Sequence, residues 1–127
     1  MSTLRAAVSA GESGPLIMLS GETDIATVAE LSELVTAQLA GGTVHLTIDM
    51  SGLSFADSAS VRVLVIAART LKERGGGLVL LRPQHGVARM LEITGADQMI
   101  TVRGETEVTP QPEQPEGTAP LSREPGR

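Results

Sequence analysis

The segment Phe55-Ala56-Asp57-Ser58-Ala59-Ser60 carries one acid and two hydroxyls directly before a stretch with helical periodicity. A serine beside an acid in such a place can act as a nucleophile, as a phosphate acceptor, or only as a helix cap. Capping is the simplest interpretation, because Ser and Asp are preferred N-cap residues and either Ser58 or Ser60 would serve. The chemistry of this segment therefore depends on what surrounds it.

A serine hydrolase finds little support in the sequence. In that scheme Ser58 is the nucleophile, His85 the base and Asp57 the orienting acid, but no G-x-S-x-G elbow is present. The run Gly75-Gly76-Gly77 resembles a phosphate cradle only superficially, because it follows a helical stretch and lacks the Lys and Ser/Thr of a P-loop. We therefore expect no catalytic residue, and we interpret the glycines as the end of a helix.

Hydrophobic periodicity indicates which elements position these residues. Apolar residues alternate or recur at helical spacing in eight segments. The strands are predicted over residues 3–9, 16–20, 44–49, 78–81 and 99–102, and the helices over residues 28–39, 60–74 and 85–94. Thr27-Val28-Ala29-Glu30 has the pattern of a capping box at the start of the first helix, and Gly95 is expected to cap the last.

The order ββαβαβαβ predicts one α/β domain over residues 1–103, with three main helices. Strands that alternate with helices imply right-handed crossovers and a mostly parallel mixed sheet, here with an initial β-hairpin. In such sheets functional groups gather beyond the carboxyl ends of the strands. Two predicted loops meet this condition, namely Gly21-Glu22-Thr23-Asp24 and residues 51–60.

Composition excludes several classes of function. The chain has 127 residues and a net charge of -5 with Lys72 as its only lysine, so we expect no direct contact with nucleic acid. Two histidines and no cysteine argue against a zinc site, and a single aromatic residue, Phe55, argues against a stacked cofactor. No apolar run is long enough for membrane insertion, and the absence of cysteine leans towards a cytoplasmic location.

Composition changes after Arg103. Residues 104–127 contain five of the seven prolines, five glutamates and few apolar residues. Such a segment cannot bury enough surface to offset the entropy lost on ordering, so we predict a disordered Pro- and Glu-rich tail.

The motif Asp57-Ser58-Ala59-Ser60-Val61 resembles the D-S-[ST]-G-L-type motif of STAS domains in bacterial anti-sigma factor antagonists. Gly21-Glu22-Thr23-Asp24 is similar to the G-E-[LI]-D loop of that family. Residues 75–80 and 87–95 resemble its later strand and third helix. The resemblance extends over roughly residues 3–103.

The resemblance implies a partner-switching protein. Its unphosphorylated form would bind an anti-sigma factor that is also a serine kinase, which frees a sigma factor. The kinase would phosphorylate Ser58, and a metal-dependent serine phosphatase would reverse the step. Seven residues are expected to face the partner, and they lie in the two loops and on the helix that follows the second. They are Glu22, Asp24, Asp57, Ser58, Ala59, Ser60 and Arg62.

The motif departs from the family pattern at two positions. Ala59 stands where Ser or Thr is usual, and Ser60 stands where Gly is usual, which makes Ser60 a second candidate for phosphorylation. Glu22 and Asp24 have a purely structural alternative, as part of the turn that precedes Thr27. The alternative function is a STAS domain that serves as a permanent subunit of a regulatory or transport complex and is not switched by phosphorylation.

Overall fold

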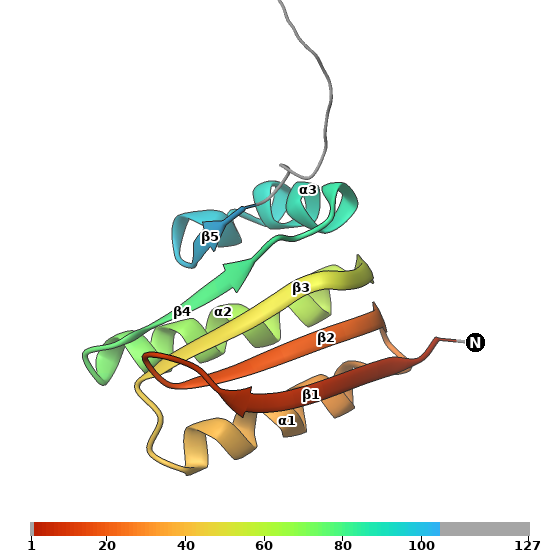
Figure 1. Ribbon diagram of the computed structural model, residues 1–127. Coiled ribbons are helices and arrows are strands. Elements are labelled where there is room, and N and C mark those ends of the chain that lie inside the picture. The colour runs from red at the N-terminus through yellow and green to blue at the C-terminus, as the bar shows by residue number, and fades with distance from the viewer. Residues whose placement is uncertain (1, 105–127) are drawn as a thin grey trace, which may run out of the picture.

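The structure is a computed structural model that describes residues 2–104, and its elements follow the predicted order ββαβαβαβ (Figure 1). The strands are β1 (Leu4–Ala10), β2 (Pro15–Thr23), β3 (His45–Ala56), β4 (Gly77–Leu81) and β5 (Thr101–Arg103). The helices are α1 (Val28–Ala40), α2 (Ser58–Glu73) and α3 (His85–Thr94), and one 3-10 turn (Ala96–Gln98) precedes β5. The predicted fold class is confirmed.

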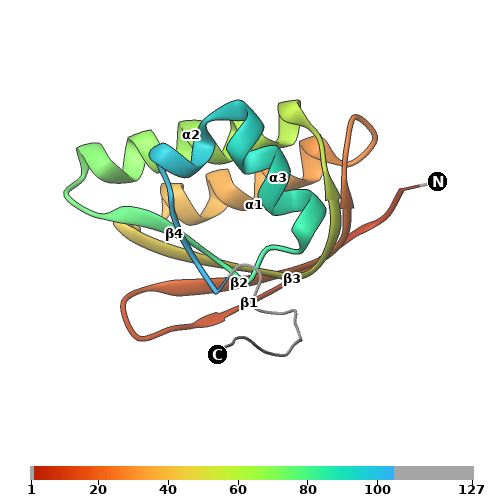
Figure 2. The same cartoon turned by 90° about the horizontal axis from the view of Figure 1, so that it is seen from above.

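The five strands form one sheet in the order β1-β2-β3-β4-β5. β1 and β2 are antiparallel, as expected of the initial hairpin, and the other neighbours are parallel. All three helices lie against one face of the sheet, and within residues 2–104 the other face has no helix over it (Figure 2). Because β2, β3 and β4 are parallel, their carboxyl ends lie at the same end of the sheet, where the chain enters each helix. This end of the sheet is called the carboxyl edge below.

The core lies between the helices and the sheet face that they cover. Ile17, Ile48 and Leu80 are completely buried and point from the central strands toward the helices. The buried apolar residues of the helices are Leu31 and Val35 of α1, Val61, Leu64, Ala67, Ala68 and Leu71 of α2, and Val87 and Leu91 of α3. Because α2 contributes the most buried side chains, its packing fixes where its first residue, Ser58, is presented.

β3 departs most from the prediction, because it continues to Ala56 although a loop was expected from residue 51. The buried residues in its second half are Met50, Leu53 and Ala56, which recur every third residue and not every second. The pairing of β2 with β3 shifts register twice in this region, and such irregularities disturb the usual alternation of a strand. The segment therefore does not look like a strand in the sequence.

The predicted capping box at α1 is wrong. The Thr27 hydroxyl accepts a hydrogen bond from the Asp24 backbone N–H at 3.1 Å and donates one to the Glu22 carbonyl oxygen at 2.8 Å. It makes no capping bond to the helix, so this side chain stabilises the β2–α1 loop. The cap predicted at Gly95 is confirmed, since this glycine ends α3 in the left-handed conformation with φ of 78°.

Two further expectations concern the limits of the domain. The predicted tail, residues 104–127, lies outside the described residues apart from Gly104. The last strand begins two residues later than predicted, because the 3-10 turn precedes it.

Among residues 2–104, no helix has both the length and the apolar character needed to cross a bilayer.

The three glycines after α2 allow a matched test of the packing. Gly76 lies so close to Val44, the residue before β3, that an added Cβ would overlap the Val44 carbonyl oxygen. A Cβ on Gly77 would meet nothing within 4 Å. We expect Gly76→Ala to lower the free energy of unfolding by about 2 kcal/mol, and the control Gly77→Ala to change it by no more than about 0.5 kcal/mol. Urea unfolding followed by circular dichroism measures both, and equal losses would contradict this packing.

Candidate functional site

The structure brings the two segments singled out in the sequence together at the carboxyl edge of the sheet. Glu22 pairs with Phe55 and Thr23 with Ala56, at the last positions of the parallel β2–β3 ladder. The Asp57 backbone N–H then donates to the Thr23 carbonyl oxygen at 3.1 Å. This bond ties the start of α2 to the end of β2, so both segments contribute to one surface.

Asp57 sets the start of α2, two residues earlier than predicted. It is the N-cap residue, with extended backbone, and its carboxylate accepts a bond from the Ser60 backbone N–H at 2.9 Å. Ser58 is consequently the first helical residue, and its side chain and that of Ala59 are exposed. Capping is thus the role of Asp57, which leaves the Ser58 hydroxyl available to solvent.

Ser60 is not at the surface, contrary to the expectation that it could receive a phosphate or face a partner. Its side chain is only 1% exposed. Its hydroxyl is buried and has no hydrogen-bond partner among residues 2–104. A helix that begins at Ser58 turns its third residue toward the core, so the Ser60 hydroxyl is not accessible to solvent in the folded domain.

Glu22 and Asp24 use their carboxylates within the domain. Glu22 accepts a bond from the Thr3 backbone N–H at 3.1 Å, and Asp24 accepts bonds from the Ser2 hydroxyl and from the Ala26 backbone N–H. The hydrogen bond from Ser2, together with those from Ala26 and Thr27, holds the pKa of Asp24 below its ordinary value. These acids fix the loop and the start of β1, which supports their structural alternative.

Two exposed apolar residues at this edge were missed in the sequence. Ile25, in the β2–α1 loop, is 89% exposed, and Phe55, near the end of β3, is 47% exposed. Exposed residues also continue along α2, where Ser58, Arg62 and Ile66 recur every fourth residue and so share one face. An isoleucine in an otherwise polar loop was the signal that could have found this apolar surface.

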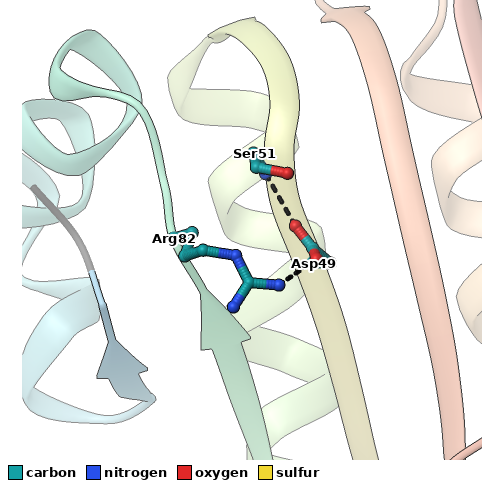
Figure 3. Close-up of polar contacts among 3 residues, drawn as sticks. All are labelled: Asp49, Ser51 and Arg82. Atoms are coloured by element: carbon teal, nitrogen blue, oxygen red, sulfur yellow. Dashed lines mark hydrogen bonds and ion pairs between the residues drawn. The ribbon is translucent and has the colours of Figure 1, made fainter. Parts of the chain in front are cut away.

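An ion pair supports β3 below the site and was also missed (Figure 3). Asp49 on β3 is 5% exposed and contacts the guanidinium of Arg82, which follows β4 in a left-handed backbone conformation with φ of 50°. The Ser51 backbone N–H donates to the same carboxylate at 2.9 Å, and Gln84 donates to the Ser51 carbonyl oxygen at 2.7 Å. These bonds connect β3 to the segment after β4.

The charge on Asp49 depends on this arrangement. Burial raises the pKa of its carboxyl, but hydrogen bonds from Ser51 and the hydrogen bond and charge of Arg82 outweigh that effect. The pKa of Asp49 in the folded domain therefore lies below its ordinary value. Asp49 is charged at neutral pH, and its interactions favour the folded state.

Both histidines are exposed residues, each at the beginning of an element. His45 begins β3, at the end of the sheet away from Ser58, and His85 begins α3; both are exposed. Among residues 2–104, no group of three histidine, aspartate or glutamate side chains is arranged to hold a metal ion. The carboxyl edge presents the exposed Ser58 hydroxyl and the exposed apolar residues Ile25 and Phe55.

A sheet with helices on one face and an exposed serine at the start of the helix after β3 is the architecture of a STAS-type domain. The chain belongs to the STAS domain family, since the family described as "Mlab, STAS domain" matches residues 6–102. This match confirms the resemblance identified in the sequence.

Known proteins agree with this assignment. An anti-sigma-B factor antagonist of Staphylococcus aureus is 29% identical over 92 residues, which cover 72% of this chain and 85% of that protein. An anti-sigma factor antagonist from Mycobacterium paratuberculosis shares the fold with a TM-score of 0.72 and 22% identity, over 80% of this chain and 86% of that one. The anti-sigma factor antagonist SpoIIAA shares the fold in two solved forms. The unphosphorylated form has a TM-score of 0.65 and 24% identity, over 81% of this chain and 90% of that one. The phosphorylated form has a TM-score of 0.61 and 21% identity, over 81% of this chain and 93% of that one.

The Asp49–Arg82 pair predicts a pH-dependent contribution to stability. Because the folded pKa of Asp49 is lowered, its contribution is complete above the unfolded value of about 4 and is lost as pH falls through the folded pKa. We expect Asp49→Asn to lower the free energy of unfolding by about 1 kcal/mol at pH 7, a modest value because Arg82 is half exposed. Arg82→Gln should behave in the same way. Urea titrations at pH 7 and pH 2 test this, and a loss that persists undiminished at pH 2 would contradict it.

The buried Ser60 hydroxyl predicts a stabilising substitution. Removing an unpartnered buried hydroxyl relieves a desolvation cost, so Ser60→Ala should raise the free energy of unfolding by about 1 kcal/mol. Ser58→Ala is the matched control, because the same atom is removed from an exposed position, and it should change stability by less than about 0.5 kcal/mol. A loss of stability in Ser60→Ala, measured by thermal unfolding, would show that the hydroxyl has a partner.

Proposed function

We propose that this chain is an anti-sigma factor antagonist, whose unphosphorylated form binds an anti-sigma factor with serine-kinase activity and so releases a sigma factor. The observation that carries the proposal is the position of Ser58, an exposed hydroxyl at the first residue of α2, at the same edge as exposed Ile25 and Phe55. The name of the staphylococcal relative supports the class of partner. The two forms in which SpoIIAA was solved support phosphorylation as the mode of regulation.

The contact area for the partner, here called the switch surface, consists of Ile25, Phe55, Ser58, Ala59 and Arg62. Apolar side chains that are exposed in the free domain gain most from burial in an interface, which makes Ile25 and Phe55 the anchors. Asp57 and the pair Glu22 and Asp24 act as positioning residues, because their carboxylates hold the helix start and the loop.

A phosphate on Ser58 would oppose docking without a change of fold. It adds a charge of about -1.5 to -2 beside Asp57, in the middle of the switch surface. A partner that covers this edge would have to desolvate that charge, which penalises the complex. Arg62 lies one turn further along the same face of α2 and would pair with the phosphate, so it would no longer be available to an acidic partner.

Complete switching needs a large but attainable difference in affinity. Moving an equilibrium from nearly full to nearly absent binding requires about 5.5 kcal/mol of differential affinity. One buried dianion and the loss of a cation can supply this together. In this scheme the chain has no catalytic role of its own, a serine phosphatase restores the binding-competent form, and the exchange takes place in the cytoplasm.

Purified wild-type protein and three variants test the proposal against the serine-kinase anti-sigma factor of the same organism. With ATP, the kinase should phosphorylate wild type at one site, mapped to Ser58 by peptide mass spectrometry, and should leave Ser58→Ala unmodified. Calorimetry without ATP should show that Ser58→Ala binds as wild type does and that Ser58→Asp binds at least about 100-fold more weakly. Ser13→Asp is the charge-matched control, because Ser13 is exposed in the hairpin at the opposite end of the sheet.

The same measurements separate the two functions considered for this domain. Equal weakening by Ser13→Asp and Ser58→Asp would mean that only net charge matters, which contradicts a localised switch surface. Tight binding by Ser58→Asp without any phosphate on wild type would contradict switching and would favour a permanently bound STAS subunit.

A further inference from the structure

β1 is an edge strand of the sheet and has few of the usual features that prevent edge pairing. In the part of the chain that the structure describes, β2 is its only neighbour, and it forms one border of the sheet (Figure 1). Its sequence LRAAVSA has no proline, no lysine and a single charge at Arg5. Its register with β2 runs without a shift from Leu4 to Ala10, so no bulge turns the edge away.

The ladder with β2 determines which backbone groups of β1 face outward. The Glu22 N–H donates to the Thr3 carbonyl oxygen at 2.9 Å, so Thr3 and Glu22 form a hydrogen-bonded pair. Such pairs alternate along an antiparallel ladder, so Arg5, Ala7 and Ser9 also direct their backbone groups toward β2. The outward-facing donors and acceptors are those of Leu4, Ala6, Val8 and Ala10.

We propose that β1 pairs with β1 of a second copy of this chain, antiparallel and centred on Ala7, to form a continuous sheet across a two-fold axis. In this register residue i lies opposite residue 14 − i of the other copy, so all seven residues of β1 are paired. Every outward-facing residue then meets another outward-facing residue, Leu4 with Ala10 and Ala6 with Val8. The edge is therefore complementary to itself in backbone hydrogen bonding.

The side chains are complementary in the same register. On the helix-covered face, Val8 is 48% exposed and would pack on Ala6 of the second copy. Val8 lies beside Ile17 of its own chain, and Ala6 lies beside Leu19 of the second. All four side chains that follow one another across the interface on this face are therefore apolar. On the open face, Ala7 of one copy would lie opposite Ala7 of the other. Each Ala7 is flanked within its own chain by Met18, which is 50% exposed. Arg5 lies opposite Ser9, so no like charges meet, whereas centring the pair on Arg5 would oppose two arginines.

The proposed pairing uses none of the residues of the switch surface. It involves residues 4–10 of β1, whereas the switch surface is formed by residues of the β2–α1 loop, β3 and α2. Because the two β1 strands are antiparallel, the switch surfaces of the two copies would face opposite directions. Each dimer would therefore present two separate docking sites.

Introduced cysteines test the register directly, since the natural chain has none. Ala7 would face its own copy in a pair without backbone hydrogen bonds, at a Cα separation of about 4.5 Å, which suits a disulfide. We expect full-length Ala7→Cys to form a covalent dimer on mild oxidation at low micromolar concentration. Ser9→Cys is the control, since Ser9 lies on the same strand and face but would be about 13 Å from its copy. Cross-linking of both variants alike, or of neither, would overturn the proposal.

Sedimentation velocity of unmodified protein provides an independent test. Wild type should sediment with twice the mass of one chain at high concentration, and Val8→Lys should remain monomeric, because a lysine on this edge opposes pairing. Ile93→Lys, at a site on α3 that is 68% exposed, is the control and should dimerise as wild type does. A wild type that is monomeric at all concentrations would overturn the proposal, whatever the partner-binding experiments show.

Discussion

The hydrogen bond from the Asp57 backbone to the Thr23 carbonyl, at the end of the β2–β3 ladder, determines the geometry of the site. It ends β3 and places Asp57 where its carboxylate caps α2. It also fixes the β2–α1 loop against the first turn of α2, although the two segments are more than thirty residues apart in the sequence. The exposed Ser58 hydroxyl and the exposed apolar residues Ile25 and Phe55 share one edge for this reason.

Acidic side chains support this arrangement from inside the domain. Glu22 and Asp24 hold the start of β1 against the loop, and Asp49 joins β3 to the segment after β4 through Arg82. In each case the carboxylate accepts hydrogen bonds from neighbouring groups of the same chain. We therefore propose that Glu22 and Asp24, which the sequence offers as contact residues, act mainly by positioning, and that a partner contacts the exposed apolar residues and Ser58.

The sequence predicted the elements whose signals are local and regular. The bounds of α3 were correct because its apolar residues recur at helical spacing and Gly95 ends it with a positive φ. The second half of β3 could not be recognised, because its irregular pairing with β2 buries every third residue. The role of Thr27 depended on which of two nearby partners its hydroxyl would choose, and the loop prevailed over the helix. The burial of Ser60 followed only once Asp57 was known to begin α2.

We propose that Ser58 carries a regulatory phosphate at the surface where a partner docks. The most direct measurement is peptide mass spectrometry of the protein purified from its own host under growth and under stress, with Ser58→Ala as the reference. We expect phosphate on Ser58 alone, in a proportion that changes with condition, and none on buried Ser60. Absence of phosphate from Ser58 under every condition, in a protein that remains bound to its partner, would contradict it.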